Sequence, residues 1–202
     1  MEFGFVDEAR SILDERFSAR ERAIAGSRRV IRSSANAIRA LHRGEMEPAQ
    51  ELIDQAGEML AGILSLLEGH PELVHVGYTH DAAKEYAEAR VTAALFRGED
   101  LPGFDELGID PVPYLHGLGE AVGEMRRRLL DLLRSGDIPA AEQAMQVMDQ
   151  IVDLLAEIDY PDGMTGGLRR TTDVARSLVE RSRADLTATV VQERLRQDLT
   201  RS

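Results

Sequence analysis

The chain of 202 residues contains no cysteine and no tryptophan, and it contains a single lysine, Lys84. The lack of cysteine excludes disulfide bonds, thiolate zinc sites and cysteine nucleophiles. No apolar run approaches the ~20 residues that a membrane-spanning helix needs. The first residues also lack the basic segment and the apolar segment of a signal peptide. We therefore expect a soluble, cytoplasmic protein.

Basic side chains are fewer than acidic ones, and almost all of them are arginines. The chain has 24 lysines and arginines against 36 aspartates and glutamates, which gives a formal net charge of −12. Such a composition resembles that of halophilic proteins, although a GC-rich genome, which favours arginine codons, would give the same arginine excess. In either case, net acidity argues against nucleic acid covering the whole outer surface. A nucleic-acid site would have to be a local arginine cluster.

Apolar residues recur with the 3.6-residue period of helices almost throughout the chain, without an alternating strand pattern of useful length. Glycine and proline mark each expected junction. With 43% hydrophobic residues, the chain can form a substantial core. We expect an all-α fold, a single domain over 1–202 built as an antiparallel bundle of about six to seven long helices. The main helices are expected at 6–43, 46–68, 79–97, 112–135, 138–157 and from about 165 towards 198, with a loop at 98–111.

Two pairs of glutamates stand at helical spacing in neighbouring expected helices. Glu85 and Glu88 are three residues apart in the segment KEYAEA, and Glu120 and Glu124 are four apart in the segment GEAVGE. Residues at these spacings share a helix face, so each pair can direct two carboxylates at one point. Four oxygen ligands from two helices would suit a hard metal cation. No histidine is arranged in the sequence to rival this set.

The first pair belongs to a narrow acidic stripe that is bordered by apolar residues. Partial burial of such a stripe is costly unless a cation or a proton neutralises the carboxylates. This pattern favours a site for Glu85 and Glu88. The alternative is that Lys84 or Arg90, from a neighbouring turn, serves as an ordinary salt-bridge partner.

The second pair lies opposite a clean apolar face, where an ordinary solvated surface is the simpler interpretation. Glu124 and Arg128 would form a common ion pair four residues apart. However, Gly117 and Gly123 flank the glutamates, and their missing side chains would let another element or a ligand come close. Spacing alone therefore leaves both interpretations open.

Arginines concentrate on the first and last expected helices, where they would suit phosphate oxygens. The alternative is pairing with neighbouring acids, such as Arg176 with Glu180, and spacing alone favours it. Only four tyrosines and five phenylalanines are available for stacking on bases, so support for base stacking is thin. The candidate nucleic-acid-binding residues are Arg28, Arg32, Arg39, Arg169, Arg170, Arg176 and Arg183.

Several segments resemble the translin and translin-associated factor X family. The segment KEYAEA at 84–89 resembles the family's Glu-Tyr-x-Glu-Ala motif, and residues 113–124, PYLHGLGEAVGE, resemble its next helix. The segments 160–162, 167–176 and 180–186 are similar to the archaeal branch of the family. The resemblance covers about residues 20–186, and the order and spacing of the segments make it specific.

The resemblance implies an all-helical subunit that forms a hollow homo- or hetero-octamer and binds single-stranded RNA or DNA. In the factor X branch, four acids form a Mg²⁺-dependent endoribonuclease site, and the matching positions here are Glu85, Glu88, Glu120 and Glu124. We therefore expect a homo-oligomer that uses these residues to hold Mg²⁺ or Mn²⁺. Factor X has aspartate at the position of Glu120, and the longer side chain could shift the metal enough to lower activity.

The translin branch lacks the full acidic set, so the chain is more similar to the catalytic branch. Two alternatives remain open. One is a non-catalytic nucleic-acid-binding or scaffold subunit of the same fold. The other is a structural helical bundle without a nucleic-acid role, for which the net charge is the main argument.

Overall fold

The computed structural model describes residues 4–74 and 77–201, and all regular secondary structure in these ranges is helical. The expected all-α fold is confirmed, and the bounds of the first five main helices agree with expectation to within two residues. The six long helices of the described ranges are α1 (Gly4–His42), α2 (Met46–Leu67), α4 (Gly77–Arg97), α5 (Pro111–Ser135), α6 (Ile138–Ala156) and α8 (Leu168–Arg201).

Two single-turn helices, α3 (Pro71–Val74) and α7 (Asp162–Thr165), were not expected from the sequence. The last long helix begins at Leu168 because the chain first completes α7. Gly166 and Gly167 follow α7 with φ of 61° and 81°, a backbone conformation that glycine adopts without steric cost. The chain thus turns sharply before α8 begins.

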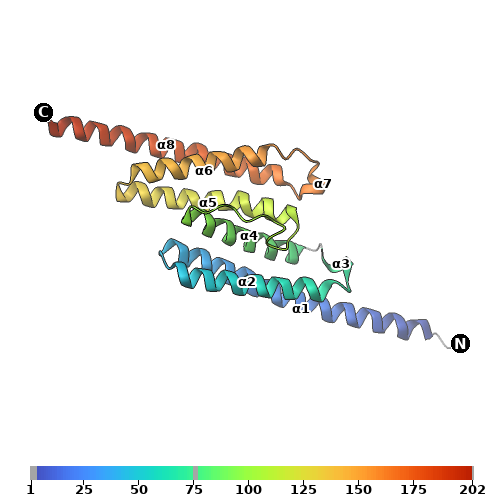
Figure 1. The fold of residues 1–202 in the computed structure, drawn as a ribbon. Coiled ribbons are helices and arrows are strands. Elements are labelled where there is room, and N and C mark those ends of the chain that lie inside the picture. The colour runs from blue at the N-terminus through green and yellow to red at the C-terminus, as the bar shows by residue number, and fades with distance from the viewer. Residues whose placement is uncertain (1–3, 75–76, 202) are drawn as a thin grey trace.

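The long helices lie side by side: α1 packs against α2 and α4, and α5 lies between α4 and the pair α6 and α8 (Figure 1). The hairpins α1–α2 and α5–α6 are antiparallel, as expected, whereas α4 and α5 run in the same direction. Two contacts show the parallel direction. His80 of α4 contacts His116 of α5, and one helical turn further along both helices Lys84 contacts Glu120, so the partners are 36 residues apart in each case.

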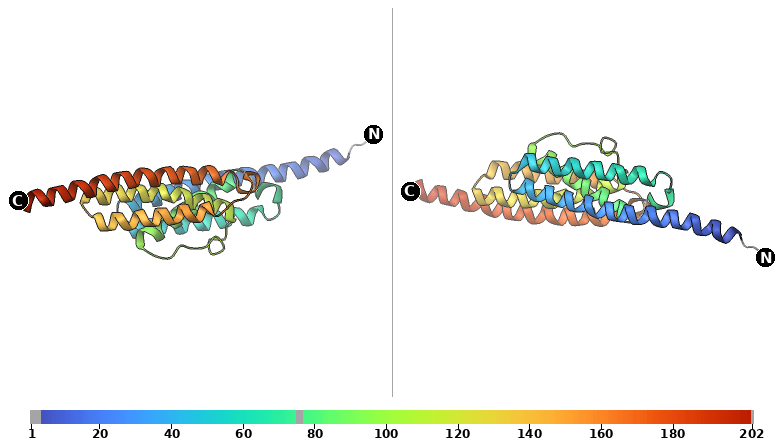
Figure 2. Two further views of the ribbon diagram at one scale, coloured as in Figure 1. Left: turned by 90° about the horizontal axis from the view of Figure 1, so that it is seen from above. Right: turned by 90° about the horizontal axis from the view of Figure 1, so that it is seen from below.

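The 98–110 segment makes the parallel arrangement of α4 and α5 possible (Figure 2). It runs along the outside of the bundle from the end of α4 back to the start of α5. Its 13 residues can span on the order of 40 Å when extended, more than the ~31 Å length of α4. At its end, Asp110 accepts a hydrogen bond of 2.9 Å from the backbone N–H of Val112 and so caps α5.

The helices α4 and α5 approach closely because small residues line their contact. A Cβ atom added to Gly117 would lie 2.6 Å from the carbonyl oxygen of Lys84 and 2.8 Å from both the backbone nitrogen of Glu88 and the Cβ of Ala87. The backbone of α4 therefore occupies the space that any larger residue at 117 would need. This contact sets the two glutamate-bearing helices against each other.

The first part of α1 and the last part of α8 extend beyond the packed helices, at opposite ends of the bundle (Figures 1 and 2). Every residue from 4 to 18 of α1 is exposed, and no described side chain of α8 after Ser182 is buried. None of the helices in the described ranges combines the length and the apolar character that crossing a membrane requires.

Gly117→Ala should destabilise the protein, because the added methyl group meets backbone atoms that cannot move independently. Overpacking of this kind costs about 1–3 kcal/mol, more than the ~1 kcal/mol that alanine gains over glycine in a helix. The matched control is Gly123→Ala on the same helix, where the nearest atom is Leu178 Cδ1 at 3.8 Å. Urea unfolding should show Gly123→Ala neutral or stabilising; equal stability of both variants would contradict the close contact.

Candidate metal centre

The contact between α4 and α5 brings three of the four candidate glutamates together. One carboxylate oxygen each of Glu85, Glu88 and Glu120 lies within 4.8 Å of the other two. Glu85 and Glu88 come from α4, and Glu120 comes from α5. Oxygen atoms at this mutual distance can share one divalent ion, and an all-carboxylate donor set suits Mg²⁺, Mn²⁺ or Ca²⁺. We call these three residues the carboxylate cluster.

The fourth glutamate, Glu124, is turned towards the end of α1. Its Oε2 lies 2.5 Å from Nε2 of His42, the last residue of α1. The His42 side chain is 3% exposed, and its ring meets the edge of Phe96 with 5.1 Å between centroids. The Arg128 guanidinium, the expected ion-pair partner of Glu124, lies over the Phe96 ring instead. The pair of His42 and Glu124 was missed from the sequence because 82 residues separate them.

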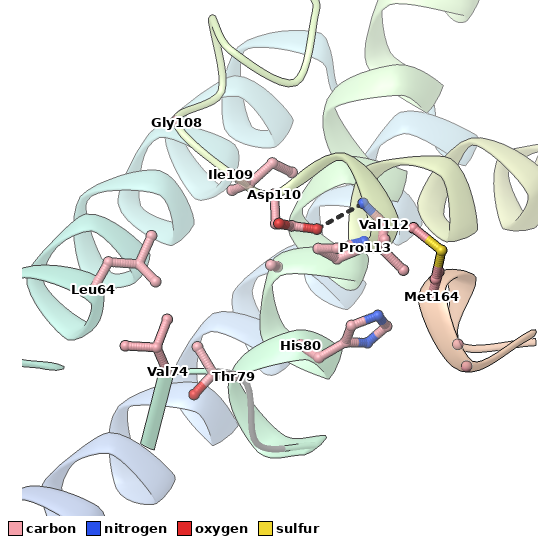
Figure 3. Close-up of a pocket in the computed structure, with 13 residues that line it drawn as sticks. Leu64, Val74, Thr79, His80, Gly108, Ile109, Asp110, Val112, Pro113 and Met164 are labelled. Carbon is pink, nitrogen blue, oxygen red and sulfur yellow. Dashed lines mark hydrogen bonds between the residues drawn. The ribbon is translucent and has the colours of Figure 1, made fainter. Parts of the chain in front are cut away.

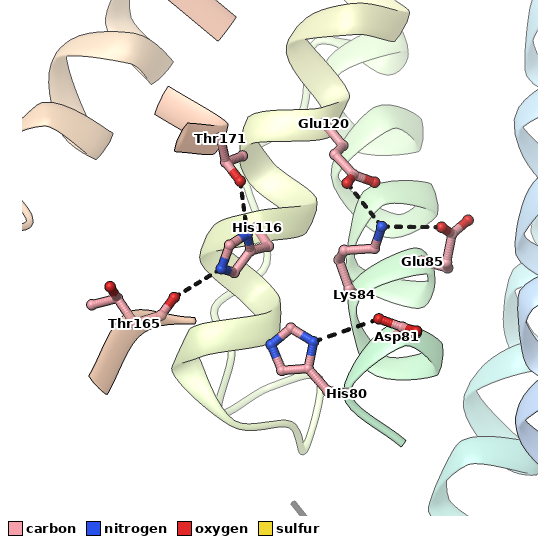
Figure 4. Close-up of polar contacts among 8 residues, drawn as sticks. All are labelled: His80, Asp81, Lys84, Glu85, His116, Glu120, Thr165 and Thr171. Carbon is pink, nitrogen blue, oxygen red and sulfur yellow. Dashed lines mark hydrogen bonds and ion pairs between the residues drawn. The ribbon is translucent and has the colours of Figure 1, made fainter. Parts of the chain in front are cut away.

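Lys84 connects the glutamates of the two helices (Figure 4). Its Nζ lies 2.8 Å from Oε1 of Glu120 and 3.3 Å from Oε1 of Glu85. Burial lowers the pKa of Lys84, but the hydrogen bond and charge of Glu120, together with Glu85, outweigh burial and raise it. The salt-bridge role considered for Lys84 is therefore present. Arg90, the other candidate for that role, lies 3.8 Å from Glu106.

Glu88 is the buried member of the carboxylate cluster, with 8% of the residue exposed. Burial is the largest of the effects that raise the pKa of its carboxyl to about 8. The negative charges of Glu120, Glu85 and Glu124 act in the same direction, and Lys84 opposes them. In the absence of a metal ion, Glu88 therefore carries its proton at neutral pH, and a cation would have to replace that proton.

His116, on α5, has a structural role. His116 is buried, and its Nε2 lies 2.8 Å from the carbonyl oxygen of Thr165. Because a carbonyl only accepts, Nε2 carries the hydrogen, and in the neutral ring Nδ1 then accepts from the Thr171 hydroxyl at 2.8 Å. Both ring nitrogens are thus engaged in tying α7 and α8 to α5 (Figure 4).

A cavity of about 650 Å³ lies near the N-terminal ends of α4 and α5 (Figure 3). Its walls are largely apolar, with Leu64, Val74 and Ile109 among them. The carboxylate of Asp110, which also lines it, is engaged in capping α5. None of the four glutamates lines this cavity, so the carboxylate cluster is a separate feature and the stronger candidate for chemistry.

All seven candidate arginines are exposed, and they lie on α1 and α8. The two helices pack against α4 and α5 respectively, so they flank the pair that carries the glutamates. On α8, Arg169, Arg176 and Arg183 form ion pairs with Asp159, Asp173 and Asp149 at 3.2, 3.2 and 2.6 Å. Arg176 thus pairs with an acid three residues before it, and not with Glu180.

The stability of the metal-free protein should fall as pH rises from about 5 to about 8. The pKa of Glu88 is about 8 in the folded protein against 4.5 ordinarily, so the folded state retains a proton that the unfolded state releases in this window. The difference in unfolding free energy between Glu88→Gln and wild type should grow by roughly 1.4 kcal/mol per pH unit at most. Denaturant unfolding at several pH values measures it, and parallel curves for both proteins would contradict the assignment.

Comparisons with known proteins found one relative by sequence and several by structure. No family model matches the chain. The chain is 28% identical over 187 residues to MJ0175 of Methanocaldococcus jannaschii, a protein described as uncharacterized, and the match covers 91% of this chain and 82% of that protein. The structure of apo-NeC3PO matches with a TM-score of 0.82 over 94% of this chain and 98% of that one, at 20% identity. That likeness shows the fold alone.

AfC3PO provides the stronger evidence of relationship. Its structure in a complex with duplex RNA matches with a TM-score of 0.86 and 33% identity, over 93% of this chain and 97% of that one. The crystal structure of AfC3PO itself matches with a TM-score of 0.85 at the same identity and coverage. By this identity over nearly the full length of both chains, the protein belongs to the translin family, as a homologue of archaeal C3PO.

Proposed function

We propose that the protein is a metal-dependent endoribonuclease that binds RNA and works as a homo-oligomer. The observation that carries the proposal is the convergence of Glu85, Glu88 and Glu120 from two helices within 4.8 Å. It occurs in a chain whose homologue AfC3PO has been solved with duplex RNA. In this proposal the carboxylate cluster holds Mg²⁺ or Mn²⁺, and Glu124 completes the site beside it.

A bound divalent ion would activate a water for attack on phosphorus and offset the charge that develops on the phosphate. The protein's own groups divide the remaining tasks. Glu85 and Glu120 are more exposed than Glu88, so they would form the side of the site that faces the RNA. Glu88 is buried and would have to lose its proton to act as a ligand, and His42 holds the Glu124 carboxylate in one orientation.

The glutamate at position 120 is compatible with this proposal. Factor X has aspartate there, and the longer side chain could displace the ion. In this protein, however, the carboxylate of Glu120 reaches both Lys84 and the oxygens of Glu85 and Glu88. The geometry therefore supports a ligand role for Glu120.

Arginines on the two flanking helices are proposed to hold the RNA backbone. The helices α1 and α8 lie on either side of the α4–α5 pair, and a phosphodiester chain crossing the carboxylate cluster would meet both. Contacts between guanidinium groups and phosphates confer little sequence preference and weaken as salt rises. We propose single-stranded RNA as the substrate, and the duplex in the AfC3PO complex makes double-stranded RNA the necessary comparison.

The extended ends of the chain support assembly into a homo-oligomer. Exposed apolar residues follow one side of each extension at helical spacing, Leu13 and Phe17 on α1 and Val191, Leu195 and Leu199 on α8. Exposed apolar stripes of this kind are typical of protein–protein contacts. We propose that they pack against other copies of the subunit, in the hollow octamer that the family resemblance implies.

Glu85→Gln and Glu120→Gln should each abolish most cleavage of labelled single-stranded RNA in Mg²⁺. Loss of a group that only orients a metal ligand costs roughly 10–100-fold, so loss of a ligand should reduce the rate constant by at least roughly 100-fold. The matched control is Glu142→Gln, an exposed glutamate on α6, which should cleave like wild type. Equal cleavage by all four proteins would overturn the assignment of the site.

A non-catalytic RNA-binding subunit is the second candidate, and one observation favours it. Lys84 already neutralises part of the charge of Glu85 and Glu120, so the cluster is partly balanced without a metal ion. Salt-sensitive retention of RNA by wild type, with no cleavage in either Mg²⁺ or Mn²⁺, would select this function over the nuclease.

Phe17→Glu and Leu195→Glu should reduce the mass of the assembly. A charge placed in an apolar contact is costly to bury, and both residues lie on extensions that the subunit's own core does not need. Analytical ultracentrifugation measures the mass, and circular dichroism checks that the helices persist. Ser11→Glu, at an exposed polar position of the same α1 extension, is the control. Assembly that is unchanged in both apolar variants would contradict the proposed contact.

A further inference from the structure

The only lysine of the sequence contacts two glutamates of the carboxylate cluster. Of its 24 basic residues, 23 are arginines and one is Lys84. The Lys84 side chain is 19% exposed, and its Nζ contacts one carboxylate of each helix, Glu85 on α4 and Glu120 on α5 (Figure 4). These two glutamates are also two of the three residues whose oxygens lie within 4.8 Å of one another. The ammonium group and a divalent ion would therefore use the same ligands.

The chemistry of lysine allows its ammonium group to be displaced from the carboxylates. Its ammonium is a compact, strongly hydrated charge on a flexible stem, so it can leave for solvent through a partly exposed site. An arginine would hold the carboxylates through a planar fork with two parallel hydrogen bonds, which is harder to displace. Two cations on the same oxygens would also repel each other strongly at such short distance.

We propose that Lys84 is an internal counter-cation that occupies the place of the divalent ion between Glu85 and Glu120 and is displaced when the ion binds. This inference rests on the metal site of the proposed function. It makes Lys84 a residue that determines selectivity. Replacing the Lys84 ammonium by a monovalent ion adds little electrostatic attraction to the carboxylates, whereas a divalent ion brings twice the charge to the same oxygens. The cluster should therefore take divalent ions and reject monovalent ones.

Calorimetric titration with Mn²⁺ at one fixed pH tests the competition directly. Lys84→Met keeps the approximate length of the side chain and removes its charge, so it should bind Mn²⁺ roughly tenfold more tightly than wild type, about 1.4 kcal/mol. Lys84→Arg should bind more weakly than Lys84→Met, because the guanidinium fork holds the carboxylates. Glu142→Gln is the control and should bind like wild type.

A second measurement uses the wild-type protein and so does not depend on the folding of a variant. Labelling with lysine enriched in ¹³C at the ε-carbon gives one side-chain NMR signal, because the chain has one lysine. Titration with Mg²⁺ should shift this signal to the position of a solvated lysine, and an equal concentration of K⁺ should leave it in place.

The outcomes separate the inference from the proposed function. If wild type binds Mn²⁺, but Lys84→Met binds it no more tightly and the lysine signal stays unmoved at saturating Mg²⁺, the displacement model is wrong and the metal site stands. If wild type binds no divalent ion, the metal-dependent function fails and the inference fails with it. Tighter binding by Lys84→Met together with the shifted signal supports both.

Discussion

The close approach of α4 and α5 is the constraint on which the candidate site depends. At Gly117 the backbone of α4 fills the position of a side chain, so the two helices lie closer than ordinary side chains would allow. Their parallel direction then places successive turns of one beside successive turns of the other. Glu85 and Glu88 meet Glu120 as a result, although Glu120 and Glu124 alone resemble an ordinary acidic surface.

The carboxylate cluster is stabilised by one cationic side chain and one proton in addition to packing. Like charges at this distance repel, and partial burial increases the cost. The protein reduces the repulsion in two ways, by the ammonium of Lys84 on the exposed carboxylates and by a proton on the buried Glu88. A site balanced in this manner is stable when empty, and its carboxylates are placed so that they could hold a metal ion.

Much of the fold could be predicted from the sequence, because helical periodicity and the glycine and proline punctuation are local signals. The bounds of α1, α2, α4, α5 and α6 and the face shared by each glutamate pair follow from such signals. The relative positions of segments that are distant in the sequence do not follow from such local signals. The parallel course of α4 and α5 depends on the path of 98–110, and the contact of His42 with Glu124 joins residues 82 positions apart. Arg176 also had two acids within reach, and only the structure shows its bond to Asp173.

The outer course of the 98–110 segment has a consequence for variation among homologues. The spacing of the glutamates across the two helices is set by the contact at Gly117 and by the cap at Asp110, both of which lie outside most of this segment. Insertions in its middle should therefore change the outline of the subunit without moving the carboxylates, whereas deletions are limited because the segment must still span the length of α4. Relatives can carry longer segments here and still keep the same arrangement of carboxylates, while position 117 tolerates little but glycine.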